Sequence, residues 1–192
     1  MDILRPATRI LAISGSLRSD SVNTSLLRAA DAVSGDDRWV ELWCGLGAIP
    51  PFNEDGEHDT PASVADMRSA IAGADALLIS TPEYNGSIPG QLKNALDWAS
   101  RPYGDSVLTG KLVGVTSASP GDYGGAWAAE HLGKVLQIAG SQVLEPSFSL
   151  PLADQAFEPG TDVLRDPAHT AALADIVAGL ERAARPALVR AS

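Results

Sequence analysis

The sequence of 192 residues contains a single cysteine, Cys44, and no long apolar run. One cysteine excludes an intrachain disulfide and a thiol-rich metal site. No stretch reaches the ~20 apolar residues that a membrane-spanning helix needs, and the first residues show no signal-peptide pattern. These absences predict a soluble protein of the cytoplasm.

Basic residues are also scarce, because 14 Lys and Arg stand against 24 Asp and Glu, for a formal net charge of −10. Nucleic acids and anionic membranes are bound through basic patches, so neither is an expected partner. The histidines at positions 58, 131 and 169 match no ligand spacing, and we expect no metal. The remaining composition, 45% hydrophobic and 20% charged, is that of a globular domain.

Strand-like apolar runs alternate with segments of helical period along the chain. Strands are expected at 9–14, 40–43, 75–80, 112–116 and from 142 onward, and helices at 23–33, from 61, at 90–100, 126–139 and 167–184. This alternation predicts an α/β fold with a parallel sheet covered on both faces by helices. Five strands favour the flavodoxin-like doubly wound sheet, order 2-1-3-4-5, over a six-stranded dinucleotide fold. We expect one domain over residues 1–186 and a loose tail over 187–192.

Ligands of such folds bind beyond the carboxyl ends of the strands, which directs attention to the loop after the first strand. Residues 15–23 are rich in hydroxyl and amide side chains. A helix start offers free N–H groups to an anion, and Ser16, Arg18, Ser21 and Asn23 can add donors to a phosphate. A serine-rich turn with Asn23 as a helix cap is an equally good interpretation. The loop carries neither a dinucleotide fingerprint nor a Walker motif.

The loops after the third and fourth strands are rich in glycine and proline. Residues 81–90 hold two prolines and two glycines, and Asn85-Gly86 is typical of a turn with positive φ. A rigid loop of this kind can present main-chain N–H groups to the edge of a flat heterocycle, with Tyr84 beside the ring. Residues 117–125 hold three glycines, which allow a ligand to approach the backbone closely. A packed surface loop and a flexible connection are the simpler alternatives.

Residues 15–23 and 81–98 strongly resemble the NADPH-dependent FMN reductase family, and the likeness spans at least residues 9–145. That family has a flavodoxin-like fold and includes flavin, quinone, azo-dye and chromate reductases. The resemblance implies FMN contacts in three groups, with Ser16, Arg18, Ser21 and Asn23 at the phosphate, Pro82, Glu83, Tyr84, Asn85 and Gly86 along the isoalloxazine ring, and Ser117, Ser119 and Gly121 in a third wall.

The implied activity is that of an NAD(P)H oxidoreductase. Hydride from NADPH or NADH passes to bound FMN, and the electrons pass on to a small acceptor (a free flavin, quinone, azo compound or metal oxyanion) in a ping-pong reaction. No side chain is assigned a catalytic role, because the cofactor carries the chemistry; N–H groups of residues 83–86 can stabilise negative charge on the ring. A non-enzymatic FMN electron carrier of flavodoxin type and a phosphate-binding module without redox activity remain alternatives.

The resemblance also implies an assembly, because family members are usually dimers or tetramers with the flavin near a subunit interface. We therefore expect a homodimer or homotetramer built partly on the helix at 90–100. Trp98 closes the motif on that helix, and its large ring makes it the best candidate for the interface.

Overall fold

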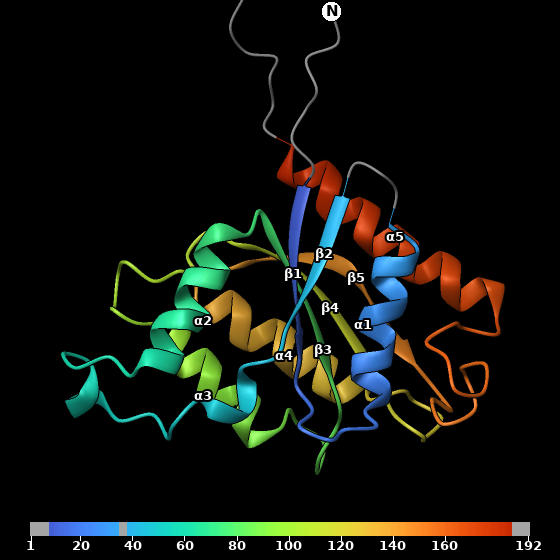
Figure 1. Ribbon diagram of the computed structural model, residues 1–192, viewed down its shortest axis with the longest axis horizontal. Helices are drawn as coiled ribbons and strands as arrows, with labels where there is room; N and C mark the ends of the chain where they lie inside the picture. The colour runs from blue at the N-terminus through green and yellow to red at the C-terminus, as the bar shows by residue number, and fades with distance from the viewer. Residues whose placement is uncertain (1–7, 35–37, 186–192) are drawn as a thin grey trace, which may run out of the picture.

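The computed structural model describes residues 8–34 and 38–185, which fold around one parallel sheet (Figure 1). The described strands lie in the order β2-β1-β3-β4-β5, which confirms the predicted doubly wound fold. Along the chain the elements are β1 (Thr8–Ser14), α1 (Val22–Ala32), β2 (Arg38–Trp43), the 3₁₀ turns η1 (Leu46–Ala48) and η2 (Glu54–Gly56), α2 (Ala62–Gly73), β3 (Ala76–Thr81), α3 (Gly90–Ala99), β4 (Leu112–Ala118), α4 (Ala126–Ile138), β5 (Gln142–Leu150) and α5 (Pro167–Ala184). The predicted tail at 187–192 lies outside the described residues, and the assignment of 1–186 to one domain stays a prediction.

Each face of the sheet has its own apolar core, because successive strand residues point to opposite sides. Leu77 and Ile79 of β3 pack with α2, α3 and α4, whereas Ala76 and Leu78 pack with α1 and α5. Figure 1 shows these two groups of helices on opposite sides of the strands. None of the described helices is long and apolar enough to cross a membrane.

The carboxyl ends of the three central strands meet at one edge of the sheet. The parallel register aligns Ser14 of β1 with Ser80 of β3, and Thr81 of β3 with Ser117 of β4. The three loops singled out in the sequence therefore leave the sheet side by side. The sequence pattern indicated only the start of β5, which continues to Leu150 after a shift of register against β4.

Gly114 of β4 makes the sheet fit closely against α5. A β-carbon added there would lie 2.9 Å from Ile176 Cγ2 and 3.1 Å from Leu180 Cδ1. We predict that Gly114→Val lowers the free energy of unfolding by about 1–3 kcal/mol, because overpacking forces the neighbours to move. The control Gly133→Ala adds a β-carbon 4.0 Å from Val143 and should be neutral or slightly stabilising. Equal urea midpoints for the two variants would contradict this packing.

Candidate functional site

The loop after β1 leads into the start of α1, whose main-chain N–H groups suit an anion. The N–H of Gly15 donates to the carbonyl of Ser80 at 2.7 Å, which fixes the loop to β3. Ser21 is the N-cap of α1, and its Oγ accepts the N–H of Thr24 at 3.4 Å. The other N–H groups of the first turn have no acceptor within the helix. They and the dipole of α1 form the type of site that binds phosphate.

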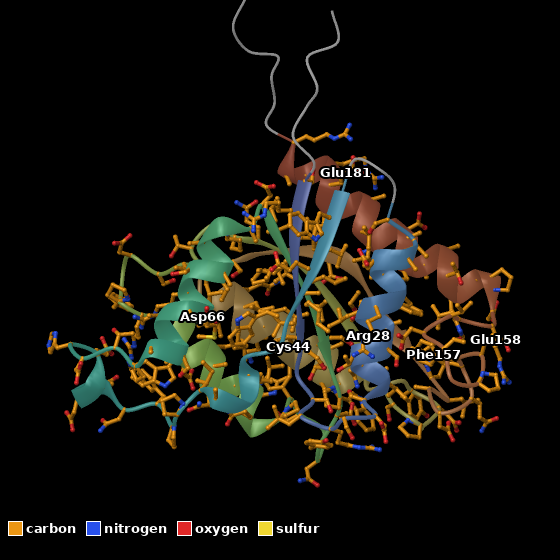
Figure 2. The ribbon with its side chains drawn as sticks, viewed as in Figure 1. Arg28, Cys44, Asp66, Phe157, Glu158 and Glu181 are labelled. Atoms are coloured by element: carbon orange, nitrogen blue, oxygen red, sulfur yellow. The ribbon has the colours of Figure 1, made fainter. Side chains whose placement is uncertain are left out.

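Ser16 and Arg18 line a pocket of about 330 Å³ at the ends of β1 and β2. Arg18 is exposed and has no ion-pair partner among the described residues, so its guanidinium is available to a ligand. Trp43 and Cys44 form part of the same wall, and Figure 2 shows Cys44 just after β2. Neither residue was predicted from the sequence to line the site. Their place in the pocket could be inferred only from the strand order, which puts β2 beside β1.

Asn23 is buried and its amide is engaged within the protein. Its Oδ1 accepts the N–H of Ala118 at 3.0 Å and the hydroxyl of Ser80 at 2.8 Å, and its Nδ2 donates to the carbonyl of Ala118 at 2.9 Å. These bonds tie the start of α1 to the ends of β3 and β4. The side chain of Asn23 therefore positions the start of α1. Because its amide is engaged, the group better placed for the predicted contact with phosphate is its main-chain N–H.

The loop at 81–90 forms a tight turn with the predicted geometry. The N–H of Tyr84 donates to Ser87 O at 2.9 Å, and the reverse bond measures 3.1 Å. Asn85 and Gly86 both have positive φ, 54° and 73°, which confirms the turn that Asn-Gly predicted. Pro82 is buried at the base of the loop, whereas Tyr84 is exposed at its tip. The hydrogen bonds and the positive φ values therefore fix the conformation of the turn, which lies beyond the carboxyl end of β3.

Glu83 connects this loop to the start of α4. Gly125 precedes α4 at φ 82° and offers no side chain to cap it. The Oε2 atom of Glu83 accepts the N–H of Ala128 at 3.2 Å instead, and a carboxylate at that position is favoured by the helix dipole. The second and third loops are therefore held together by a charged hydrogen bond.

The third loop, at 117–125, is fixed to β5 by several bonds. Ser117 is buried and its hydroxyl donates to Ser149 Oγ at 2.9 Å, which makes it a support for the wall. Ser119 donates its N–H to Leu150 O at 3.2 Å, and its Oγ accepts the N–H of Gly121 at 3.2 Å. These bonds favour a structured wall over a flexible connection.

The donors present fit FMN. Hydroxyls, a free guanidinium and helix-terminal N–H groups suit a phosphate dianion, and they gather at the end of β1. A turn of exposed main chain beside Pro82 suits a flat heterocycle, and it lies at the end of the adjacent strand β3. The predicted residues thus lie on three neighbouring loops. Several of their side chains, those of Asn23, Glu83 and Ser117 among them, bond within the protein.

A larger groove of about 700 Å³ lies elsewhere, between β5 and α5. Phe148 and Ile176 line it together with Glu145, Asp175 and Arg182. The groove shares no lining residue with the three loops, and its charges are of both signs. The larger groove therefore lies apart from the residues predicted to bind FMN.

The parallel sheet of order 2-1-3-4-5 and the helices on its two faces define a flavodoxin-like α/β protein. The model of the NADPH-dependent FMN reductase family matches residues 8–155, and the chain belongs to this family.

Relatives and solved structures agree with that assignment. An NAD(P)H-dependent FMN reductase of Pseudomonas aeruginosa is 40% identical over 163 residues, 84% of this chain and 87% of the relative. A quinone reductase of Escherichia coli is 33% identical over 161 residues, 82% and 85% of the two chains. The structure of FerB, a flavoenzyme NAD(P)H:(acceptor) oxidoreductase of Paracoccus denitrificans, superposes with a TM-score of 0.84 at 32% identity, covering 92% of this chain and 96% of FerB.

The positioning role of Asn23 predicts a loss of stability without any ligand. Asn23→Ala should lower the free energy of unfolding of the apoprotein by about 1–3 kcal/mol, because Ala118 and Ser80 lose buried partners. Ser16→Ala removes a half-buried hydroxyl from the same loop and should change stability by less than about 0.5 kcal/mol. Urea unfolding measures both variants, and an unchanged midpoint for Asn23→Ala would refute the role.

Proposed function

We propose that this chain is an NAD(P)H-dependent, FMN-containing reductase of small acceptors such as quinones and free flavins. The observation that carries the proposal is the joining of an anion-binding helix start to a rigid turn at the ends of adjacent strands. The bond from Gly15 to Ser80 and the amide of Asn23 make that connection. Relatives named as FMN and quinone reductases support it.

The phosphate end of FMN would be held by the loop after β1. The hydroxyls of Ser16 and Ser21 and the guanidinium of Arg18 are the side-chain donors, and the main-chain N–H groups of α1 complete the set. The pocket beside Ser16 and Arg18 gives room for the anion. An acidic protein can hold a dianion in this way, because donors at contact distance outweigh distant charges that salt screens.

The ring end would lie along residues 82–86, with Ser119 and Gly121 in the third wall. The N–H of Tyr84 already donates to Ser87 O. The remaining main-chain N–H groups of the turn would face the ring and stabilise negative charge on it, as the donors of an oxyanion hole do. Glu83 contributes by holding the turn against α4 through Ala128. The carboxylate of Glu83 would therefore help to form the site by holding the turn in position.

When bound, FMN supplies the two-electron chemistry, accepting hydride from NADPH or NADH and returning electrons to an acceptor. The chain positions the ring and no side chain need act as nucleophile or base. Nucleotide and acceptor would use the same open face in turn, which predicts ping-pong kinetics. We place the reaction in the cytoplasm, where NAD(P)H is supplied.

Anaerobic mixing of the FMN-loaded protein with NADPH, and separately with NADH, tests this proposal. We expect the flavin absorbance to bleach with at least one nicotinamide and to return when a quinone is added. A flavodoxin-type carrier would bind FMN yet stay oxidised until a separate reductase is supplied. A protein that stays colourless in FMN would favour the phosphate-binding module.

Arg18 gives a sharper prediction about the phosphate end. Arg18→Gln should weaken FMN binding roughly 10- to 100-fold, because a charge-assisted hydrogen bond is lost. Arg28 provides the control, because it lies on α1 near the segment of Phe157 and Glu158 (Figure 2) and contacts Asp162 at 3.8 Å. Arg28→Gln removes the same charge and should leave the affinity nearly unchanged. Quenching of FMN fluorescence measures both, and equal losses would indicate a general effect of charge.

A further inference from the structure

Two side chains of α3 are bonded to the segment that follows β2. Trp98, which was expected at a subunit interface, is only 2% exposed, and its Nε1 donates to Pro50 O at 2.9 Å. Asn94 forms two bonds, because its Nδ2 donates to Pro50 O at 2.8 Å and its Oδ1 accepts the N–H of Phe52 at 2.7 Å. This face of α3 therefore binds a segment of its own chain.

Gln91 continues the same row of contacts at the first turn of α3. Its Nε2 donates to Leu46 O at 2.8 Å and to Ile49 O at 2.9 Å. Gln91, Asn94 and Trp98 follow the spacing i, i+3, i+7, which places them on one face of the helix. Figure 1 shows the segment that contains η1, in cyan, lying beside α3. Gln91 thus bonds to both ends of η1.

The η1 turn has few bonds of its own. Its N-cap, Gly45, has no side chain to cap it. The internal bonds run from Ala48 N–H to Gly45 O at 3.0 Å and from Ile49 N–H to Leu46 O at 3.3 Å. A single 3₁₀ turn of this kind is marginal by itself. The buried side chains of Leu46 and Ile49 and the donors of Gln91 therefore hold η1 in place.

One side of η1 forms a wall of the pocket beside Arg18. Leu46 and Gly47 line this pocket together with Leu17 and Arg18. A β-carbon added at Gly47 would lie 3.6 Å from Leu17 Cδ2, so η1 is in van der Waals reach of the loop after β1. The position of η1 therefore sets the width of the pocket on the side of β2.

The loop on the other side of the pocket also contacts α3. A β-carbon added at Gly15 would lie 2.8 Å from Leu92 Cδ2, so Leu92 packs closely against the loop after β1. Its neighbour Gln91 bonds to η1 on the side of β2. One turn of α3 is therefore in contact with both segments that form the pocket.

The bonds from Gln91 also orient two main-chain dipoles. Gln91 does not itself line the pocket, so its bonds hold the carbonyl oxygens of Leu46 and Ile49 towards α3. A carbonyl oxygen carries partial negative charge and would repel a phosphate. An amide side chain that keeps these oxygens engaged therefore favours an anion in the pocket.

We propose that Gln91 is a positioning residue for the phosphate of FMN. It acts through η1, which it fixes as the wall of the pocket opposite Ser16 and Arg18. The identity of the ligand rests on the proposed function, whereas the hold of Gln91 on η1 does not. Because α3 directly follows the loop at 81–90, the same helix connects the proposed ring end of the site to its phosphate end.

Titration of the apoprotein with FMN, and separately with riboflavin, tests this role. Gln91→Met removes both donors and keeps the length of the side chain. It should weaken FMN binding roughly 10-fold, the equivalent of one or two hydrogen bonds. Riboflavin lacks the phosphate, so its affinity should be nearly unchanged. The control Gln137→Met makes the same change at an exposed position of α4 and should affect neither ligand.

The ratio of the two affinities separates positioning from general support of the fold. Equal losses for FMN and riboflavin, or an unchanged FMN affinity, would overturn the proposal. Urea unfolding establishes that each variant is folded under the conditions of the titration. Gln91→Asn, which is one methylene too short to reach both carbonyls, should show the same selective loss and replaces Gln91→Met if that variant does not fold.

Amide hydrogen exchange of the FMN-free chain tests the hold on η1 by itself. The N–H groups of Ala48 and Ile49 should exchange faster in Gln91→Met than in the wild type, because η1 then opens more often. Exchange within β3 should be the same in both proteins. Equal exchange at residues 48 and 49 would overturn the proposed action through η1.

These results are separable from the proposed function. A selective loss of FMN affinity in a chain that NAD(P)H cannot reduce would refute the reductase and leave the role of Gln91 standing. Bleaching by NADPH in the wild type, without a selective loss in Gln91→Met, would refute the role of Gln91 alone. A wild-type chain that binds no FMN would refute both.

Discussion

The buried amide of Asn23 is the contact on which the proposed site depends. It accepts the N–H of Ala118 and the hydroxyl of Ser80 and donates to the carbonyl of Ala118. One side chain thereby joins the start of α1 to the ends of two neighbouring strands. A buried amide with these partners is costly to replace, because each orphaned group would lose a hydrogen bond without gaining water. The start of α1 is consequently held in place by hydrogen bonds of the protein itself.

Glu83 has a similar positioning role in the part of the site proposed for the flavin ring. Its carboxylate caps α4, which begins without a capping side chain of its own, and so holds two loops in one arrangement. Main-chain N–H groups make up most of the donors in the proposed site. A chain of net charge −10 would hold an anion there through these fixed dipoles and the guanidinium of Arg18.

Local patterns in the sequence predicted most of the fold and part of the site. The alternating strands and helices, and the Asn85-Gly86 turn, depend on neighbours along the chain and were correct. Contacts between distant segments were not predictable in this way. Trp43 reaches the pocket because β2 lies beside β1. Trp98 is buried because the segment around Pro50 folds over α3, and the residue types alone do not distinguish such burial from an interface.

We propose that the three loops at the ends of β1, β3 and β4 form the FMN site. Amide hydrogen exchange of the chain with and without FMN tests this assignment. Exchange should slow within residues 15–25, 81–87 and 117–125 when FMN is present, and it should not change along the larger groove between β5 and α5. Protection confined to the residues that line that groove, at 144–148 and 172–183, would refute the assignment.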